Sequence, residues 1–372
     1  MINVVGSILG SSGYDIHTRS LANELNKLID VKLITNLIPG WERLVNDEEL
    51  KMIKRKEDND INLIITNPIY WKINCNAKRN WVYCVWEGDK VPDFFIEEML
   101  SPNIEYIIVP SQHTKDAVMR TMAEYHKDDL DVNEKGSTTF LDKVYHYDGS
   151  WDWDKIKIIP HGVDLSKFYP TEKKSKVFTF LANKGFRNME DRGGIQYLIK
   201  AYLEEFKPTD NVRLVLKINP AYGVPNLSKM GFNFGKDTAP VLVNATNMKY
   251  EDLNGLYNEC DVFVSPTRAE SFNIPCLEAM ACGKPVITTN FGGQTDYVNE
   301  ENGWLIDYDL TEVKHEVEYE GIKWATPKIE DLRAKLRKAY ENQDFKGKIE
   351  CAKQKAKELT WANTAKQVIN LK

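Results

Sequence analysis

The stretch SPTRAESFNIPCLEAMACGKPVI, residues 265–287, decides the fold of the second half of the chain. It begins as an apolar strand, breaks at a polar turn, continues as an apolar stretch of helical length and ends in a second strand. Pro275 suits the first helical position, where its missing N–H costs nothing. Gly283 suits the position just beyond the helix end. The stretch therefore predicts the order strand, turn, helix, turn, strand.

Outward from this stretch, short apolar runs alternate with amphipathic stretches of helical length. In the first half we expect helices at about 18–28 and 113–124, and strands at 2–5, 31–34, 61–65, 81–86, 106–109 and 156–160. In the second half we expect helices at 193–206, 250–258 and 275–282, and strands at 177–181, 213–217, 240–243, 261–265 and 285–289. This alternation predicts an α/β protein with two Rossmann-like, doubly wound domains that face a cleft.

The domain boundary is expected near Pro170. Residues 1–169 would form the first domain and residues 170–345 the second. The region 126–153 interrupts the pattern and is interpreted as an inserted loop or small hairpin. A Lys-rich amphipathic helix over about 346–370, within the final segment 346–372, is expected to pack back on the first domain. Ligands of doubly wound folds bind beyond the carboxyl ends of the strands.

Composition excludes several classes of protein. The 372 residues carry 49 Lys and Arg against 55 Asp and Glu, a net charge of −6, which argues against a nucleic-acid partner. The six cysteines lack C-x-x-C spacing and the six histidines form no ligand cluster, so we expect reduced thiols, no metal and no cofactor. The first residues resemble a strand rather than a secretory signal, and no apolar run is long enough to span a bilayer. We therefore expect a cytoplasmic protein.

Two glutamates flank the turn in the opening stretch. Glu270 precedes the turn, and Glu278 is expected in the first helical turn, next to backbone amides that are free donors at a helix N-terminus. Two carboxylates there would oppose a bare anion. They fit better as acceptors for the hydroxyls of a sugar and a ribose, with a diphosphate held mainly by other groups.

This stretch resembles the E-x7-E element, E-G-F-G-L-P-x-L-E-A-M-A, of the retaining GT-B glycosyltransferases of family 4. Ser271 and Asn273 stand here in place of two glycines. The segments 109–116, 158–168, 290–298 and 302–306 resemble the family in the same order, so the resemblance covers residues 1 to about 310. It implies transfer of a sugar from a nucleotide diphosphate sugar to a hydroxyl acceptor, which is a glycan, a lipid-linked or a protein-linked group, with an α-linkage. It also implies that residues 1–169 form the acceptor-side domain and residues 170–345 the nucleotide-sugar-binding domain.

The resemblance also implies roles for residues of this stretch and of the loop before it. Glu270 would be catalytic and lie by the donor sugar, and Glu278 would bind the ribose. The remaining donor contacts would come from the turn itself: Ser271, Phe272, Asn273 and Ile274. The family's basic pair, in G-R-x4-K-G, corresponds to Arg187 and Arg192, which would stabilise the departing diphosphate in place of a metal ion. Lys184 is a nearby alternative for that role.

Candidates in the first half follow two of its strands. Glycines at 6, 10 and 13 lack the G-x-G-x-x-G spacing of dinucleotide sites. The resemblance puts this loop by the donor phosphate and the acceptor, with Gly13 allowing close approach and with Tyr14 and His17 as acceptor contacts. A structural role for His17 is an equal alternative.

The resemblance also implies a His or an acidic residue near the reacting carbon after the fourth strand, where Glu87 is the candidate and Asp89 the candidate for an acceptor contact. Salt-bridged loop carboxylates are the alternative there, and His161 is expected to be structural.

Two other functions fit the same scaffold: a sugar-phosphate enzyme such as a phosphorylase or epimerase, and a catalytically inactive sugar-nucleotide-binding protein. No enzymic nucleophile is strongly placed in the sequence, which favours a front-face transfer. A lipid-linked acceptor would suit the basic segment 51–56 and aromatics expected to be exposed, such as Trp41 and Trp71, and would bring peripheral contact with a membrane.

Overall fold

The computed structural model describes residues 1–10, 12–35, 45–125, 137–140, 143–146, 152–186, 188, 190–220, 223–314 and 319–372. Unit 1 comprises Met1–His161, Val313–Ile322 and Trp361–Lys372, and unit 2 comprises Gly162–Glu312 and Lys323–Thr360. The chain therefore passes from unit 1 to unit 2 after His161, earlier than the boundary expected near Pro170. Of the final segment 346–372, only Trp361–Lys372 belongs to unit 1.

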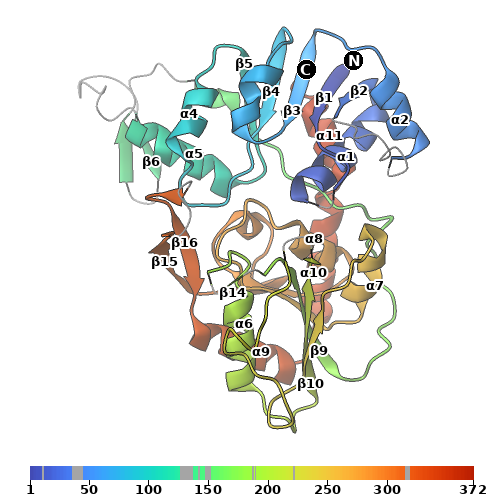
Figure 1. The fold of residues 1–372 in the computed structure, drawn as a ribbon, viewed down its shortest axis with the longest axis vertical. Coiled ribbons are helices and arrows are strands. Elements are labelled where there is room, and N and C mark those ends of the chain that lie inside the picture. The colour runs from blue at the N-terminus through green and yellow to red at the C-terminus, as the bar shows by residue number, and fades with distance from the viewer. Residues whose placement is uncertain are drawn as a thin grey trace. The chain divides into compact units, whose positions relative to one another are not determined.

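Unit 1 is built on a six-stranded parallel sheet in the order β2-β1-β3-β4-β5-β8 (Figure 1). The strands are β1 (Ile2–Gly6), β2 (Val31–Ile34), β3 (Ile61–Ile65), β4 (Arg79–Tyr83), β5 (Ile104–Val109) and β8 (Ile156–Ile158). β1 and β3 are buried along their whole length, as expected for central strands covered on both faces. All six strands expected in this half are confirmed.

Helices connect these strands: α1 (Gly13–Asn26), α2 (Asp47–Lys54), α3 (Trp71–Asn74), α4 (Asp93–Met99) and α5 (Gln112–Tyr125). α11 (Trp361–Ile369) lies beside α1 (Figure 1). α1 begins five residues before the expected start at Thr18 because Ser12 and Asp15 form a capping box. The expectation that Trp71 is exposed is wrong: it is fully buried, and its indole donates to the carbonyl of Thr66 at 3.1 Å. Trp41 lies outside the described residues.

Unit 2 repeats the same plan, with a parallel sheet in the order β11-β10-β9-β12-β13-β14. The strands are β9 (Phe178–Lys184), β10 (Val212–Ile218), β11 (Val241–Asn244), β12 (Val262–Ser265), β13 (Val286–Thr289) and β14 (Gly303–Ile306). The chain adds β10 and β11 on one side of β9 and then crosses to β12. The carboxyl ends of β9 and β12 therefore form the switch point of the sheet, where doubly wound folds bind ligands.

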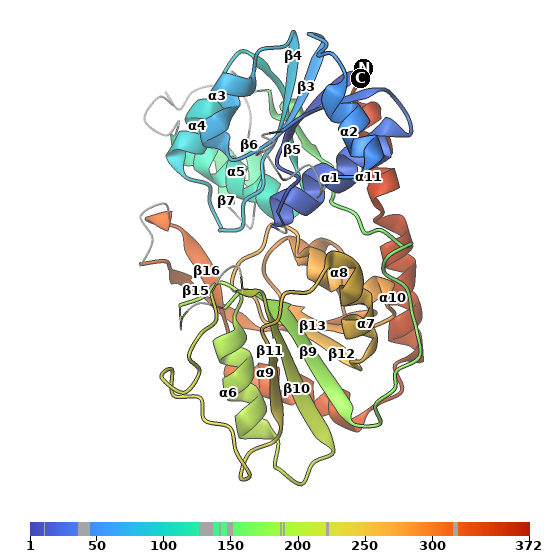
Figure 2. The same cartoon turned by 45° about the vertical axis from the view of Figure 1, so that its right-hand side comes forward.

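Helices cover both faces of this sheet. α6 (Ile195–Glu205) and α9 (Ile329–Glu341) pack together on one face, and α8 (Ile274–Ala281) and α10 (Lys346–Glu358) pack together on the other (Figure 2). α7 (Leu253–Asn258) follows β11 after the short 3-10 turn η5 (Tyr250–Asp252).

The opening stretch, residues 265–287, folds in the predicted order of strand, turn, helix, turn and strand, although α8 begins at Ile274 and Pro275 is its second residue. Gly283 follows α8 with φ 71°, in the left-handed region that favours glycine. Its N–H bonds the carbonyl of Met280 at 2.9 Å, and the N–H of Lys284 bonds that of Ala279 at 2.9 Å. This pair of bonds is the Schellman motif, which ends the helix and directs the chain into β13.

The predicted single helix over 346–370 is wrong: the structure has two helices, α10 and α11. The chain leaves the helical conformation at Leu359 (φ −102°, ψ 70°), whose carbonyl accepts the N–H of Val163 at 2.9 Å. Backbone pairing with a distant segment therefore overrides the helical pattern. An antiparallel hairpin of β15 (Tyr308–Glu312) and β16 (Lys323–Pro327) was also not expected.

The region 126–153 contains a small antiparallel hairpin of β6 (Ser137–Phe140) and β7 (Lys143–His146). The hairpin interpretation of this insertion is therefore confirmed for these strands, whereas residues 126–136, 141–142 and 147–151 lie outside the described residues.

Candidate functional site

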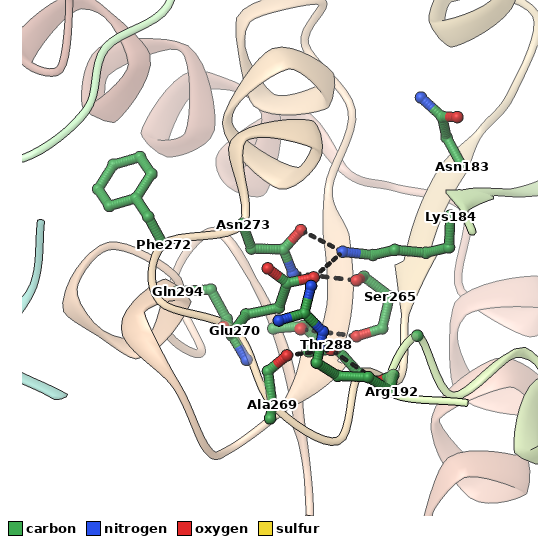
Figure 3. Close-up of polar contacts among 12 residues, drawn as sticks. Asn183, Lys184, Arg192, Ser265, Ala269, Glu270, Phe272, Asn273, Thr288 and Gln294 are labelled. Carbon is green, nitrogen blue, oxygen red and sulfur yellow. Dashed lines mark hydrogen bonds and ion pairs between the residues drawn. The ribbon is translucent and has the colours of Figure 1, made fainter. Parts of the chain in front are cut away.

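A buried ion pair lies at the switch point of the unit 2 sheet (Figure 3). Lys184 is the last residue of β9, and Glu270 lies in the turn between β12 and α8. Nζ of Lys184 lies 2.7 Å from Oε1 of Glu270, and the two side chains are 7% and 19% exposed. Nζ also donates to Oδ1 of Asn273 at 2.7 Å. The ammonium therefore ties the end of β9 to the turn that starts α8.

Arg192 adds a second cation, and its guanidinium lies beside the Glu270 carboxylate (Figure 3). Burial alone would raise the pKa of Glu270, but the charges of Lys184 and Arg192, together with the Lys184 hydrogen bond, outweigh burial and leave the pKa below its usual value. Glu270 is therefore ionised at neutral pH. Two cations against one carboxylate leave this cluster with one net positive charge, which suits an anionic ligand.

Residues 190–194, which precede α6, are held in place by the turn that follows β12. The carbonyl of Arg192 accepts the N–H of Arg268 at 2.8 Å and the hydroxyl of Thr267 at 3.2 Å. Gly194 has φ 75°, and a Cβ there would stand 1.8 Å from the carbonyl oxygen of Pro266. Only glycine fits this approach, so the close contact of the two turns fixes the backbone that carries Arg192.

The structure brings together three of the four residues expected to share the donor's charged end. Lys184, Arg192 and Glu270 meet, whereas Arg187 lies outside the described residues. Lys184, the alternative in the sequence analysis, is the cation with a direct ion pair to Glu270.

Asn273 shows how the turn replaces a glycine of the resembled motif. It is the only non-glycine residue with positive φ in the described part of the chain (φ 68°, ψ 61°), and Asn visits this region more readily than most residues. Its amide donates from Nδ2 to Oγ of Ser265 at 3.0 Å while Oδ1 accepts from Lys184. The replacement therefore keeps the turn and adds a link to the ion pair.

The other turn residues expected to contact the donor are buried. Phe272 points away from the ion pair in Figure 3, and its ring packs against Tyr297 with centroids 5.0 Å apart. The hydroxyl of Tyr297 lies 2.8 Å and 2.7 Å from the carbonyl oxygens of Phe272 and Asn273, which holds the turn. Ser271 is 8% exposed, and Ile274 is the first residue of α8.

Glu278 is the fifth residue of α8, so the expectation that it lies in the first turn is wrong. Its two oxygens accept hydroxyl hydrogen bonds from Tyr250 at 2.5 Å and Tyr257 at 2.7 Å. Burial raises the pKa of Glu278, although the two hydroxyls and Lys184 act in the opposite direction. The hydroxyl of Tyr257 also accepts from Nδ2 of Asn183 at 3.1 Å. A hydrogen-bond chain therefore links Glu278 to the end of β9.

Sequence reasoning missed the two tyrosines on Glu278. The signal available was their spacing of seven residues, which puts two side chains on one face of a helix. Nothing in the sequence pattern alone identifies their partner, because η5 and α7 are adjacent to α8 only in the folded unit.

In unit 1 the loop after β1 contains its own anion. The carboxylate of Asp15 accepts the N–H groups of Gly10 at 2.9 Å and Ser12 at 3.1 Å. Burial would raise the pKa of Asp15, but these bonds and those from the hydroxyls of Ser12 and Ser7 lower it. Because Asp15 occupies amides of the kind a phosphate would use, the loop is poorly suited to a second anion.

Gly13 and Tyr14, the two candidate residues just before Asp15, are less buried than Asp15. Gly13 is the first residue of α1, where a Cβ would meet no described atom within 4 Å. Tyr14 follows it and is half-buried.

His17 is fully buried in a cluster of aromatic rings. Its ring centroid lies 4.2 Å from that of Tyr83, 4.3 Å from that of His161 and 5.5 Å from that of Trp361. Burial lowers the pKa of His17 far below its usual value and that of His161 to about 3. Both rings are therefore neutral, and this burial corresponds to the structural alternatives for His17 and His161.

Glu87 follows β4 and is hydrogen-bonded by Tyr319 of the same unit. The hydroxyl of Tyr319 donates to Oε1 of Glu87 at 2.9 Å, and the Tyr319 ring stacks on Trp86 with centroids 4.9 Å apart. Asp89 is 8% exposed, and its backbone carbonyl accepts from Arg120 at 2.8 Å. The sequence analysis gave no role to Tyr319, which is far from Glu87 along the chain.

No group of three or more His, Cys, Asp or Glu side chains in the described ranges is arranged to hold a metal ion. The six cysteines are free thiols, and Cys276 and Cys282 are buried in and just after α8. Within the same ranges, no helix has the length and apolar character needed to cross a bilayer.

Residues 185–319 match the family model of glycosyl transferases group 1. The chain is 28% identical over 173 residues to the D-inositol 3-phosphate glycosyltransferase of Paenarthrobacter aurescens, covering 44% of this chain and 42% of that protein. It is 27% identical over 223 residues to a probable sucrose-phosphate synthase of Thermosipho melanesiensis, covering 59% and 47%. The chain thus spans less than half the length of these relatives.

Among solved structures, Anabaena Alr3699/HepE in complex with UDP-glucose matches 100% of this chain and 98% of that chain, with a TM-score of 0.67 and 13% identity. Such identity establishes the fold alone. The two parallel six-stranded sheets with alternating helices agree with it and confirm the predicted α/β fold with two Rossmann-like domains. Residues 185–319 therefore carry the domain of glycosyl transferases group 1, within the two-domain α/β fold of the GT-B glycosyltransferases.

Proposed function

We propose that this protein is a retaining glycosyltransferase that moves a sugar from a nucleoside diphosphate sugar to a hydroxyl acceptor with an α-linkage and without a metal ion. The observation that carries the proposal is the cluster of buried Lys184 with the partly buried Arg192 and Glu270 at the switch point of the unit 2 sheet. Fixed cations in a site that excludes water stabilise the charge of a leaving diphosphate. The retaining outcome rests on the resemblance of the Glu270–Glu278 stretch to the family 4 enzymes.

In the proposed reaction the bond between the anomeric carbon and the diphosphate oxygen breaks as the acceptor oxygen bonds to the same face of that carbon. The acceptor proton passes to the departing phosphate oxygen, so the step needs no enzymic nucleophile or base. Lys184 and Arg192 stabilise the charge that grows on the diphosphate. Glu270 accepts hydrogen bonds from hydroxyls of the donor sugar and so orients its anomeric carbon.

Glu278 is proposed to hold the ribose of the donor. An ionised carboxylate offers about four lone-pair sites, and the hydroxyls of Tyr250 and Tyr257 occupy two of them. The rest can accept ribose hydroxyls. Glu87 and Asp89 of unit 1 remain our candidates on the acceptor side, and a glycan, lipid-linked or protein-linked hydroxyl remains our proposal for the acceptor.

The test is a transfer assay in EDTA, with UDP-, GDP- and ADP-sugars, a panel of hydroxyl acceptors and NMR of the new anomeric centre. We expect an α-linked product, with a rate lowered about 100-fold in Lys184→Met and in Glu270→Ala. Lys200→Met, an exposed position on α6, is the matched control and should keep the wild-type rate.

The other candidate functions give different results in the same assay. Dependence of turnover on inorganic phosphate would indicate a phosphorylase. Tight nucleotide binding with no turnover on any acceptor would indicate a binding protein that has lost catalysis.

A further inference from the structure

Lys217 is a buried lysine that the proposed reaction does not use. It is the last residue but one of β10 and is 4% exposed. Its ammonium donates to the carbonyl oxygens of Ile218 and Thr246, both at 3.0 Å. Burial lowers the pKa of Lys217, and no carboxylate of the described residues opposes that effect. A buried ammonium without a counter-charge is costly, so a polar ligand at this position would offset part of the cost.

The position of Lys217 connects it to the proposed ribose site. Register pairs Lys217 with Asn183 of β9, and Asn183 donates to Tyr257, which donates to Glu278. On its other side Lys217 holds Thr246, in the loop that leads into η5, which carries the second tyrosine on Glu278. Asn183 is therefore linked by hydrogen bonds to Glu278, the carboxylate proposed to bind the ribose, and Thr246 lies four residues before Tyr250, which donates to the same carboxylate.

The number of hydrogen-bond donors on the Lys217 ammonium suggests which kind of group it binds. An ammonium has three N–H donors and accepts no hydrogen bond, and two of the three are used by backbone carbonyls. No described residue accepts the third, which remains for a ligand. Because the nucleobase is attached to the ribose, the base is the part of the donor that would extend from Glu278 to its neighbours.

We infer that Lys217 reads the base of the donor, by donating its third N–H to a keto oxygen at C4 of a pyrimidine or C6 of a purine. Cytosine and adenine carry an amino group at the same position. Because that amino group and the ammonium both donate hydrogen bonds, they would form none with each other. A site built around one hydrogen bond rejects a ligand that cannot complete it. Lys217 would thus select UDP- or GDP-type donors over CDP- and ADP-type donors. This inference rests on the proposed function of the ribose site.

Two matched pairs of nucleotides test it. UDP and CDP share their ribose, diphosphate and ring skeleton and differ at C4 and N3, and IDP and ADP differ in the same way at C6 and N1. Calorimetric titration of the full chain should show at least one keto nucleotide binding about tenfold or more tightly than its amino partner. In Lys217→Met, a side chain of similar length without a donor, that ratio should fall to within about twofold.

Pyrophosphate is the control ligand, since it reaches the cations but has no base, and its affinity should not change in Lys217→Met. Equal binding within both pairs by the wild-type chain overturns the inference, and this result needs no variant to fold. A variant that binds all nucleotides more weakly with an unchanged ratio also overturns it, because Lys217 is then a structural lysine. If none of the nucleotides binds, the proposed function fails together with the inference.

Discussion

Glu270→Gln separates two effects of the Glu270 carboxylate. One is its contribution to folding stability, and the other is its proposed competition with a bound diphosphate. Removing one partner of a buried ion pair costs about 3–5 kcal/mol of folding free energy. Here the new amide oxygen can still accept from Lys184, and Asn273 keeps its own bond to that ammonium at 2.7 Å. We therefore expect the free energy of unfolding to fall by only about 1–3 kcal/mol.

The same change should strengthen the binding of a nucleoside diphosphate. In the proposed donor site, the carboxylate of Glu270, on which the charges of Lys184 and Arg192 act, would compete with the diphosphate for these two cations. A unit charge roughly 6 Å away at an effective dielectric constant of about 20 contributes about 3 kcal/mol of repulsion. If about half of this is offset by relaxation of the site, affinity rises about tenfold. Turnover should fall about 100-fold, because the donor sugar loses the acceptor that orients it.

The assay is calorimetric titration with UDP and GDP in EDTA, beside initial rates of transfer. Glu278→Gln is the matched control, because it removes a buried carboxylate of the same helix region that pairs with tyrosines rather than with the cations. It should not tighten binding. Unchanged or weaker binding by a folded Glu270→Gln chain would refute the reasoning that the carboxylate and the diphosphate share these cations.

A pH series adds an internal check on the same variant. The pKa of Glu270 is lower in the folded chain than in the unfolded chain. Its contribution to stability is therefore present above the unfolded value and is lost as the pH falls through the folded value. The difference in unfolding free energy between wild type and Glu270→Gln should shrink in acid.

Three further predictions concern the scaffold. Asn273→Ala should be about 1 kcal/mol less stable than Asn273→Gly in urea denaturation, because both lose the side-chain bonds but only alanine is strained at φ 68°; equal stabilities would contradict this. Gly194→Ala should lose about 2–4 kcal/mol or fail to fold, whereas Gly255→Ala, with open space around it, should not lose stability. His17 is buried with a lowered pKa, so only the unfolded chain gains its proton below about pH 6.5; the contribution of His17 to stability should fall by about 1.4 kcal/mol per pH unit as the pH drops from there, and His17→Phe should reduce the slope of the whole chain by that amount.

Much of the fold could be predicted because the spacing of apolar residues and the Gly and Pro residues at the ends of elements indicate the same boundaries along most of the chain. Short runs rich in apolar residues, such as 61–65 with its single polar residue Asn62, indicate strands buried on both faces, and Gly283 ends α8 through a local motif that sequence alone can indicate. The predictions were wrong where contacts between distant segments determine the local structure. The backbone pairing of Val163 with Leu359 splits the last helix, and no local pattern carries that information.

The residues of the candidate site also fall into two groups, those that local sequence identifies and those that contacts between distant segments bring together. The Glu270–Glu278 stretch is local, so its residues could be named from the sequence. The ion pair of Lys184 depends on the parallel pairing of β9 with β12, and the position of Lys184 at the strand end settles its contact with Glu270. The tyrosines on Glu278 and the contact of Tyr319 with Glu87 depend on packing between elements far apart in sequence, which spacing does not reveal.

The most direct measurement is a crystal structure of the chain with a bound nucleoside diphosphate, grown without divalent metal ions. The diphosphate should lie within hydrogen-bond distance of Nζ of Lys184 and the guanidinium of Arg192, with a ribose hydroxyl on the carboxylate of Glu278. A nucleotide bound elsewhere, with the Lys184–Glu270 pair unchanged and no ligand beside it, would contradict the proposed donor site.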